Sequence, residues 1–468
     1  MNNLRRTRIV ATIGPKSDSP QMLDALIGAG ADVFRISASH DPIDVVRTRI
    51  AAVREAAART GVQVAVMVDL SGPKLRCIPS TEPTELVEGE TWRIVSGPNP
   101  KGDHTLGSTI PSEVWSRIPV GTVLAIGDGA LQFEVTERDD NGVTCRAMAT
   151  GTLRGRPGLH IPSDLLSMDS PTAEDLEVVK VCVEADVDAI AVSFVRTAAD
   201  VQRVKAAAPG CLIVAKIETA LAVRDLDAVI ASADAVMVAR GDLGLEYPLS
   251  EIPFLQRRII RAAIAAARPV ITATQMLESM VSATVPTRAE AADVANAILD
   301  GTSAVMLSGE TAIGVDPVAA VRTMSDFAAR ADKEIVPRTE LPLPQTGDSK
   351  TSTVTHAVSE AAHRVAFQTG AVAVIGLTDS GFTARALSRW RSPLPLIAAT
   401  RSERTVRQLR LSWGVSAVRV YSADADEVLT ELVGAGVLPS DAPVVVVSGV
   451  PGGRASDTVR VRRTPQSG

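Results

Sequence analysis

The sequence lacks the features that mark secreted, membrane-spanning and zinc-binding proteins. Only four cysteines occur in 468 residues, and none has a CxxC or histidine-associated spacing: Cys77, Cys145, Cys182 and Cys211. This argues against a disulfide framework or a zinc site and indicates reduced cysteines. No apolar run reaches the roughly 18 residues that suggest a membrane helix, and the first residues, MNNLRRTRIVATIG, contain no apolar segment followed by a cleavage site. We therefore expect a cytoplasmic protein with no membrane partner.

A large excess of charge of one sign is also missing. The formal net charge is −6, and the sequence has no basic stripe. Because nucleic acids attract clustered lysine and arginine, we expect no nucleic-acid partner. Hydrophobic residues make up 46% and charged residues 22% of the chain, as in ordinary globular proteins. A chain of this length exceeds what one hydrophobic core usually organises, so we expect two or three domains.

Eight short β-branched runs, most of them separated by helical patterns, predict the main architecture. They are RIVATIG from Arg8, DVFRIS from Asp32, QVAVMVD from Gln63, VDAIAVSF from Val187, CLIVAKIE from Cys211, AVMVARGD from Ala235, PVITATQ from Pro269 and SAVMLSGE from Ser303. Apolar strands that alternate with helices are typical of a parallel sheet covered on both faces. Eight such repeats predict an α/β fold with a closed (β/α)8 TIM barrel.

Two further units interrupt and follow this barrel. Runs three and four start 124 residues apart, at Gln63 and Val187, whereas the other runs start 24 to 34 residues apart. Between them, alternating hydrophobicity and glycine-rich turns predict a small β-domain at residues 73–158. The catalytic barrel would comprise residues 1–72 and 159–335. A proline-rich connector, VPRTELPLPQTGDSK, then leads to a predicted open α/β sheet at residues 350–468.

Six of the eight runs end in polar or charged side chains. In a (β/α)8 barrel the C-terminal ends of the strands form one rim, where active sites are assembled. The residues there are Arg35, Ser37, Ser39 and His40 after run two, Asp69 after run three, Lys216 and Glu218 after run five, Arg240 and Asp242 after run six, Thr274 and Gln275 after run seven, and Ser308 and Glu310 after run eight. One such charge can simply face solvent, but six runs together indicate a site.

The carboxylates at this rim predict a divalent-cation site. Glu218 and Asp242 follow neighbouring runs, and their oxygens suit magnesium, which takes its remaining ligands from substrate and water. Lys216 lies two residues before Glu218 and so points to the same side of its strand. With Arg35 it would bind an anionic phosphorylated substrate. Gly241 would let a ligand approach the main chain and would offer its N–H to a carboxylate. The pattern indicates phosphoryl transfer or enolate chemistry.

These motifs together resemble those of the pyruvate kinase family. The resemblance rests on TRIVATIGP, RISASH, VDLSGPKLR, AVSFVR, AKIE, MVARGDLG, TATQMLESM, PTRAEAADVANAILDG and VMLSGET, in the family's order, and on VIGLTDSGFTARALSRWR and VVVVSGVPGG near the C-terminus. It implies the glycolytic transfer of a phosphoryl group from phosphoenolpyruvate to ADP, with magnesium (or manganese) as cofactor. It also implies a small β-barrel lid that excludes water, an allosteric C-terminal domain and a homotetramer.

The resemblance further implies roles for individual residues. Catalysis would fall to Lys216, Arg35, Thr274 and Ser308, substrate binding to Arg35, Lys216, Gly241, Asp242 and Thr274, and magnesium binding to Glu218 and Asp242. The nucleotide would lie beside Ser37, His40, Arg76 and Arg156. A monovalent-cation site would include Ser37, Ser39, Asp69 and the carbonyl of Leu70. A sugar-phosphate or nucleotide effector would bind the loop of Thr378, Asp379, Ser380, Gly381 and Thr383.

The surroundings of the monovalent-cation site depart from the family's pattern. The family has asparagine at Ser37, glycine at Asp41, threonine at Leu70 and glutamate at Lys74. The ammonium of Lys74 could neutralise a buried Asp69 as a potassium ion would. We therefore expect an enzyme that does not require potassium. The alternative is that Lys74 is a solvated hinge residue.

The nucleotide and effector regions depart as well. Pro157 stands where the family has lysine, and His160 where it has asparagine. Arg156 would then take over the phosphate contact, and nucleotide affinity or base preference would change. Asp379 adds a negative charge to the effector loop, which disfavours a bisphosphate; a helix N-cap role is the alternative.

Two other functions stay open. A weakly active pyruvate-kinase-like paralogue that senses phosphoenolpyruvate or an effector would explain the changes at Ser37 and Pro157. The same rim could also serve carbon–carbon bond chemistry on an enolate. Retention of Lys216, Glu218 and Asp242 argues against the sensor, and the two additional units argue, by resemblance, against the second alternative.

Overall fold

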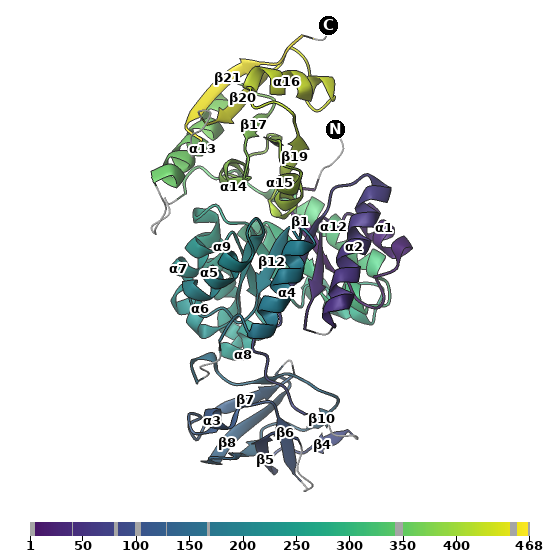
Figure 1. Ribbon diagram of the computed structural model, residues 1–468, viewed down its shortest axis with the longest axis vertical. Coiled ribbons are helices and arrows are strands. Elements are labelled where there is room, and N and C mark those ends of the chain that lie inside the picture. Colours follow the sequence, from purple (N-terminus) through teal and green to yellow (C-terminus); the bar gives the residue numbers. More distant parts are fainter. Residues whose placement is uncertain are drawn as a thin grey trace.

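Eight parallel strands close into a barrel at the centre of the computed structural model (Figure 1), which describes residues 5–39, 41–78, 83–98, 104–127, 129–165, 169–341, 350–449 and 456–466. In order around the barrel, the strands are β1 (Arg8–Thr12), β16 (Ala304–Leu307), β15 (Val270–Ala273), β14 (Ala235–Ala239), β13 (Leu212–Ile217), β12 (Ala189–Val192), β3 (Ala65–Asp69) and β2 (Val33–Ser37). All eight predicted runs form barrel strands. They are apolar throughout because one face packs inside the barrel and the other against helices. The predicted fold class is confirmed.

Helices surround the barrel and follow the predicted alternation. They are α1 (Pro20–Ala29), α2 (Ile43–Thr60), α4 (Ala173–Glu184), α5 (Ala198–Ala207), α6 (Ala220–Arg224), α7 (Leu226–Ser232), α8 (Arg240–Glu246), α9 (Ile252–Ala265), α10 (Arg288–Asp300), α11 (Gly309–Ala312) and α12 (Pro317–Ala331). Local sequence sets several ends: Thr287 and Glu290 form a reciprocal capping box at the start of α10, and Gly301 ends that helix with φ +106°.

The segment between β3 and β12 forms a separate β-unit with its own core. Its elements are β4 (Thr84–Leu86), β5 (Thr91–Ser96), β6 (Thr105–Ser108), α3 (Ser112–Trp115), β7 (Val123–Ile126), β8 (Leu131–Asp139), β9 (Gly142–Ala147), β10 (Gly151–Leu153) and β11 (Leu159–His160). Six strands form a sheet in the order β11-β7-β8-β9-β5-β6. Single bridges of Arg76 to Gly158 and of Cys77 to Ser108 link the two ends of this sheet. A buried Trp115 and Phe133 fill the interior.

The C-terminal part is a five-stranded sheet in the order β19-β18-β17-β20-β21, in which only β21 is antiparallel. Its elements are α13 (Lys350–Gln368), β17 (Val374–Leu377), α14 (Phe382–Ser388), β18 (Leu396–Thr400), α15 (Glu403–Gln408), β19 (Val415–Arg419), α16 (Ala425–Gly434), β20 (Pro443–Ser448) and β21 (Thr458–Arg463). Helices cover it, as the predicted open α/β sheet requires.

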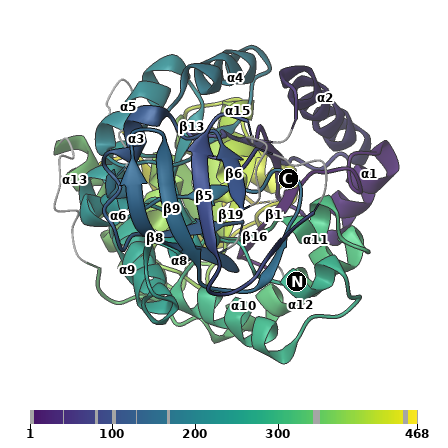
Figure 2. The same ribbon diagram turned by 90° about the horizontal axis from the view of Figure 1, so that it is seen from below.

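The three parts are stacked along the long axis of the molecule. In Figure 1 the β-unit lies below the barrel and the C-terminal sheet above it, and in Figure 2 the β-unit overlies the barrel when seen from below. The buried side chain of Leu411 packs into the barrel's interior core from the C-terminal side of the junction. This arrangement leaves the carboxyl ends of the barrel strands facing the β-unit.

Two expectations from composition can be compared with the structure. All four cysteines are buried and free of disulfide bonds, and burial raises the pKa of each thiol. Within the part of the chain that the structure describes, no helix combines the length and apolar character needed to cross a bilayer.

A buried ion-pair network joins the C-terminal part to the barrel. Asp188, fully buried at the start of β12, accepts hydrogen bonds from Arg407 Nε at 2.8 Å and from Arg54 Nη2 at 2.9 Å. Arg404 and Arg407 both pair with Asp186. Because these charges share one set of partners, loss of a carboxylate leaves guanidinium groups uncompensated.

The replacement Asp188→Ala is therefore expected to destabilise the protein by about 3–5 kcal/mol. The matched control is Glu403→Ala, because Glu403 pairs with Arg419 at 3.7 Å where both side chains are half exposed. Its expected cost is below about 1 kcal/mol. Thermal and urea unfolding midpoints measure the difference. Equal destabilisation by the two replacements would contradict the assigned role of this network.

Candidate active site

The carboxyl ends of the barrel strands bring several charged side chains together around the ammonium of Lys216. Its Nζ donates a 2.7 Å hydrogen bond to Ser193 Oγ and lies 3.2 Å from Glu218 Oε2 and 3.5 Å from Asp69 Oδ1. Asp69 ends β3, Ser193 follows β12, and Lys216 lies on β13, so three consecutive strands supply this cluster. Asp242 follows the next strand, β14, in the first turn of α8.

Burial and neighbouring charges act in opposite directions on this cluster. Burial by itself lowers the pKa of Lys216, but Asp69, Glu218 and Asp242 together raise that pKa above its ordinary value. For Asp69, burial favours the neutral acid, whereas Lys216 and Arg35 lower its pKa below the ordinary value. Both groups therefore stay charged at neutral pH. The pair is a fixed ammonium–carboxylate contact inside the site.

Two carboxylates face the site with oxygen atoms still available. Glu218 is buried; its Oε1 accepts a 2.7 Å hydrogen bond from the Phe194 N–H, while its Oε2 accepts none. Burial, opposed by Lys216 and aided by Asp242, raises the pKa of Glu218. No hydrogen bond or ion pair joins the Asp242 carboxylate to the other described side chains. Available oxygens of this kind fit a hard divalent cation, whose charge would favour the ionised form of Glu218.

These two carboxylates do not form a complete cage. Among the described residues, no group of three or more histidine, cysteine, aspartate and glutamate side chains is arranged to hold a metal ion. Magnesium commonly binds through one or two carboxylates and takes its other ligands from substrate phosphates and water. Glu218 and Asp242 would supply two such carboxylates and leave the other ligand positions to substrate and water.

A strained turn follows β15, the strand that pairs with β14. Thr274 and Gln275 both have positive φ, +65° and +52°, which is an outlier for a β-branched residue. Arg240 holds the turn by donating to the carbonyl oxygen of Thr274 at 2.7 Å and by pairing with Asp293. The Gly241 N–H donates a 2.8 Å hydrogen bond to Thr274 Oγ1.

Two of the predicted rim charges support the backbone. Arg240, counted among the rim charges, supports the backbone and does not face a ligand site. Glu310 is likewise structural: its fully buried carboxylate accepts hydrogen bonds from the Leu277 and Ser308 N–H groups. The strand-end position alone did not distinguish supporting charges from those that face the cavity.

Eight of the remaining predicted rim residues line one cavity of about 570 Å³, whereas Glu218 and Gln275 are not part of its lining. Arg35 pairs with Asp69 at 2.7 Å and donates to Thr12 Oγ1 at 3.2 Å. Ser308 presents a buried hydroxyl with no hydrogen-bond partner. The cavity is lined by Arg35, Ser37, Ser39, Asp69, Ser71, Lys74, Ser193, Phe194, Lys216, Met237, Ala239, Asp242, Thr274, Met306 and Ser308.

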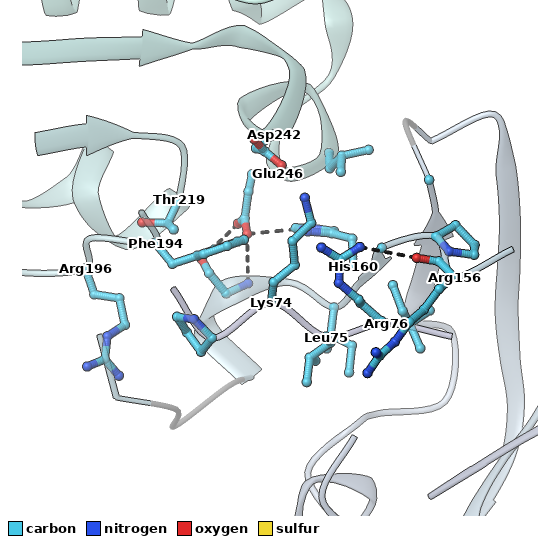
Figure 3. A pocket seen from close by; sticks show the side chains of 18 residues that line it. Lys74, Leu75, Arg76, Arg156, His160, Phe194, Arg196, Thr219, Asp242 and Glu246 are labelled. Carbon is cyan, nitrogen blue, oxygen red and sulfur yellow. Dashed lines mark hydrogen bonds and ion pairs between the residues drawn. The ribbon is translucent and has the colours of Figure 1, made fainter. Parts of the chain in front are cut away.

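A larger cleft of about 1230 Å³ lies between the barrel and the β-unit and shares Lys74, Phe194 and Asp242 with the first cavity. Figure 3 shows that Lys74 extends toward helix α8, which carries Asp242 and Glu246. Arg76 Nη1 donates to the Arg156 carbonyl at 3.2 Å, so these two residues lie side by side. The cleft therefore has Lys74, Arg76 and Arg156 in the same lining as Asp242.

The residues predicted to bind the nucleotide and the monovalent cation are divided between the cleft and the inner cavity. Arg76, Arg156 and Lys74 line the cleft, whereas Ser37, Ser39, Asp69 and Lys74 line the inner cavity. The Leu70 carbonyl accepts a 2.7 Å hydrogen bond from Ser193 Oγ. Lys74 is exposed and forms no ion pair with the other described residues. His40 lies outside the described residues.

The predicted effector loop lies in the C-terminal sheet, between β17 and α14. Thr378 Oγ1 accepts a 2.9 Å hydrogen bond from the Gly381 N–H, and Thr383 shares a 2.6 Å hydrogen bond with Ser456. Gly381 precedes α14, so the N-cap alternative for Asp379 is wrong. The Asp379 carboxylate instead lies 3.7 Å from Arg401.

Comparison with known proteins agrees with this architecture. Residues 4–321 match the family described as pyruvate kinase, barrel domain, and residues 356–462 match pyruvate kinase, alpha/beta domain. The chain is 37% identical to the pyruvate kinase of Agrobacterium vitis over 98% of each chain. It is 39% identical to pyruvate kinase 2 of Synechocystis, covering 89% of this chain and 71% of that protein.

The chain belongs to the pyruvate kinase family.

A solved pyruvate kinase from Cryptosporidium parvum superposes with a TM-score of 0.86 at 30% identity, covering 98% of this chain and 96% of that one. The resemblance stated from the motifs is thus confirmed, and the chain is a phosphotransferase. Pyruvate kinases act on phosphoenolpyruvate and ADP and generally use magnesium.

Sequence reasoning missed two residues that organise the site. Ser193 contacts Lys216, Asp69 and Leu70 at once. Glu246 accepts hydrogen bonds from the Ser163 N–H and hydroxyl, where the chain returns from the β-unit. Ser193 lies near the end of the predicted run from Val187, which was an available signal. Glu246 and Ser163 are more than 80 positions apart, so no local sequence pattern indicates their contact.

We expect Ser193 to act as a positioning residue for Lys216. The replacement Ser193→Ala removes the acceptor that aims the ammonium, so kcat should fall roughly tenfold to a hundredfold while KM for phosphoenolpyruvate changes little. Steady-state assays of pyruvate formation measure both constants.

The control is Ser170→Ala, because the buried Ser170 hydroxyl donates to the Ser193 carbonyl and does not contact Lys216. It should reduce stability without the loss in kcat. A parallel loss of kcat in both variants would mean that Ser193 acts only through general packing.

Proposed function

We propose that this enzyme transfers the phosphoryl group of phosphoenolpyruvate to ADP through the cavity around Lys216. The observation that carries this proposal is the convergence of Lys216, Glu218 and Asp242 from adjacent strands beside a cavity that opens into a cationic cleft. The bond between phosphorus and the enol oxygen breaks as phosphorus bonds to a β-phosphate oxygen of ADP. The enolate then takes a proton at its methylene carbon to give pyruvate.

The side chains divide these tasks by position. Arg35 and Lys216 bind the phosphoryl group, and the Lys216 ammonium stabilises the charge that develops during transfer. Asp69 keeps both cations aligned. The substrate carboxylate lies beside Gly241, Asp242 and Thr274.

Protonation of the enolate takes place on the opposite side of the cavity. The hydroxyls of Thr274 and Ser308 are arranged there to hold a water that delivers the proton. The unpartnered Ser308 hydroxyl supports this assignment.

Glu218 and Asp242 would hold magnesium or manganese. When bound, the cation neutralises charge on the ester and the enolate oxygen. The chain's own contribution is to present two carboxylates from adjacent strands, with the Lys216 ammonium 3.2 Å from Glu218 Oε2. The β-unit, connected next to this site, would act as a lid that excludes water from the transferred group.

The cleft between barrel and β-unit is proposed to bind ADP. Arg76 and Arg156 would contact its phosphates, with Ser37 and His40 nearby. Burial and the neighbouring Arg156 lower the pKa of Arg76, which is a sign of two guanidinium groups that share one region. A polyanionic diphosphate between them would relieve that repulsion.

The test is a coupled assay of pyruvate formation with and without ADP. Glu218→Gln should lower kcat by about 10²–10³ and raise the magnesium concentration needed for half-maximal rate, because the amide cannot balance the cation. The control Arg76→Met should raise KM for ADP without changing the magnesium requirement.

Two outcomes of this assay would overturn the proposal. One is a wild-type protein that forms no ATP from phosphoenolpyruvate, as a sensor would behave. The other is a Glu218→Gln variant with unchanged metal dependence. Pyruvate release at the same rate without ADP would indicate different enolate chemistry.

We further propose that the enzyme works without potassium because Lys74 supplies the monovalent charge. Lys74 lines the same cavity as Ser37, Ser39 and Asp69. When Arg35 and Lys216 bind phosphate, Asp69 loses part of its compensation, and a tethered ammonium restores it without an ion from solution. The exposed position of Lys74 also fits the alternative of a solvated hinge residue.

Replacement of potassium by tetramethylammonium separates these two readings. The wild type should keep most of its activity, while Lys74→Ala should need added potassium. Lys180→Ala, at an exposed lysine paired with Glu177 on the surface, is the control and should behave as wild type. Loss of most wild-type activity without potassium would reject the proposal.

Regulation and assembly form the last part of the proposal. The loop Thr378–Thr383 follows β17 at the carboxyl edge of an α/β sheet, the usual ligand position, and Arg401 beside Asp379 offers a cation. A monophosphate effector, of a sugar or a nucleotide, fits better than a bisphosphate because Asp379 repels added charge. The exposed Leu249 and Phe254 support subunit contacts in a homotetramer.

Titration of activity with sugar and nucleoside monophosphates tests the effector loop. Asp379→Ser should extend the response to a sugar bisphosphate, because the repelling charge is gone. Sedimentation velocity gives the assembly state. An activity unaffected by all these phosphates would contradict the proposed effector site. A monomer at the concentration used in the assay would contradict the proposed homotetramer.

A further inference from the structure

Four arginines line a small cavity where the C-terminal sheet meets the base of the barrel. The cavity is about 260 Å³, and Arg268 enters it from the start of β15, while Arg385, Arg389 and Arg391 enter from α14 and the turn after it. Ser412 lies in its wall. The cavity lies at the end of the barrel opposite the catalytic rim.

Three of these arginines are buried, and Arg268 is partly buried. The exposed fractions are 6% for Arg385, 4% for Arg389 and 2% for Arg391. Arginine is almost never fully buried without a partner of opposite charge. Yet none of the four arginines forms an ion pair with any described residue, in contrast to Arg404 and Arg407 nearby.

Several of their N–H groups have no hydrogen-bond partner. They are Nε of Arg268, Nε and Nη1 of Arg385, Nε of Arg389, and Nε and Nη1 of Arg391, and the hydroxyl of Ser412 is also unpaired. The other guanidinium nitrogens donate mainly to carbonyl groups: Arg391 Nη2 to Gly301 and Thr302, and Arg389 Nη1 to Ala265. The unpaired donors come from different elements and share one cavity.

The nearest carboxylates are already used by other groups. Asp332 accepts from the Thr7 hydroxyl and the Trp413 indole N–H, and Asp234 pairs with Lys205 at 2.7 Å. The Arg391 guanidinium lies 4.5 Å from the centre of the Trp413 ring, a contact that offsets only part of the lost hydration.

Burial therefore leaves the positive charges of these arginines without a compensating negative charge. It lowers the pKa of Arg385, next to the like charge of Arg268, and that of Arg389, each to about 10, so both remain charged at neutral pH. Arginine does not escape burial by releasing its proton, as lysine can. A counter-ion from solution is the remaining way to compensate the charge and to satisfy the N–H groups together.

We propose that this cavity is a binding site for a small tetrahedral oxyanion of the phosphate class. Guanidinium forks match the oxygens of phosphate or sulfate, and donors from several directions suit a tetrahedral ion better than a planar carboxylate. The cavity is small, so it can hold one such ion but not a nucleotide. The site is separate from the catalytic cavity and from the Thr378–Thr383 loop.

An anion in this cavity would also connect the C-terminal sheet to two strands of the barrel. Arg385 Nη2 also donates to the Ser380 carbonyl in the effector loop, at 3.1 Å. Arg391 donates to the residues just before β16, the strand that Ser308 follows, and Arg268 precedes β15, the strand that Thr274 follows. A bound oxyanion thus fixes the C-terminal loop against two strands that lead to the catalytic rim.

Two measurements on the full-length enzyme test this site. A crystal soaked in selenate, a tetrahedral analogue with an anomalous signal, should show a peak in the cavity within hydrogen-bond distance of Arg385 and Arg391. In solution, about 10 mM inorganic phosphate should raise Tm relative to chloride at equal ionic strength, because the ligand binds the folded state.

Arg385→Met should lose the part of this Tm increase that belongs to the cavity. Arg404→Met, an arginine of the same junction that is paired with Asp186, should keep the full increase. Should Arg385→Met not fold, Ser412→Ala serves instead, with a weaker selenate peak expected. A cavity without selenate in crystals whose catalytic site is filled, or an unchanged phosphate effect in Arg385→Met, would overturn the proposal.

Discussion

A buried ammonium held between carboxylates of adjacent strands is the interaction on which the active site depends. An isolated charge at the position of Lys216 would be costly, because burial removes its hydration. Asp69, Glu218 and Asp242 reverse that effect on its pKa, so the ammonium stays charged. Two cations and three carboxylates, with Arg35 included, leave the site slightly acidic. A bound divalent cation makes the net charge of the site positive, which favours binding of a negatively charged phosphate ester.

The barrel makes this cluster possible because its strands are rigid and in register. Interior side chains such as Val10, Met67 and Met237 are fully buried, and Leu411 closes the end remote from the site. The rim residues therefore project from a packed base. Thr274 has a positive φ, which a β-branched residue disfavours. The hydrogen bond from Arg240 to the Thr274 carbonyl oxygen stabilises this strained backbone conformation.

Most of the architecture could be predicted from the sequence because its signals are local. The eight apolar runs, such as the one from Ala235, carry the strand signal within a few residues, and the long gap after Gln63 reveals the inserted unit. The C-terminal strand β19 (Val415–Arg419) was missed because it is short and partly exposed. The strand β21 (Thr458–Arg463) contains three arginines and pairs along the edge of β20.

The details of the site depended on contacts between distant positions. Lys216, Glu218 and Asp242 were predicted to converge because strand order brings them together, and they do. Sequence could not tell that Arg240 supports a turn while Arg35 faces the cavity, since both are charges at strand ends. The cavity formed by Arg385 and Arg391 depends on how the C-terminal sheet meets the barrel, and no local pattern marks it.

The most direct test of the central claim is a crystal structure with manganese and oxalate, a planar dianion that mimics the enolate of pyruvate. The account predicts an anomalous manganese peak about 2.1 Å from oxygens of both Glu218 and Asp242, with oxalate between that ion and Lys216. A manganese ion bound elsewhere, or oxalate out of reach of Lys216, would contradict it.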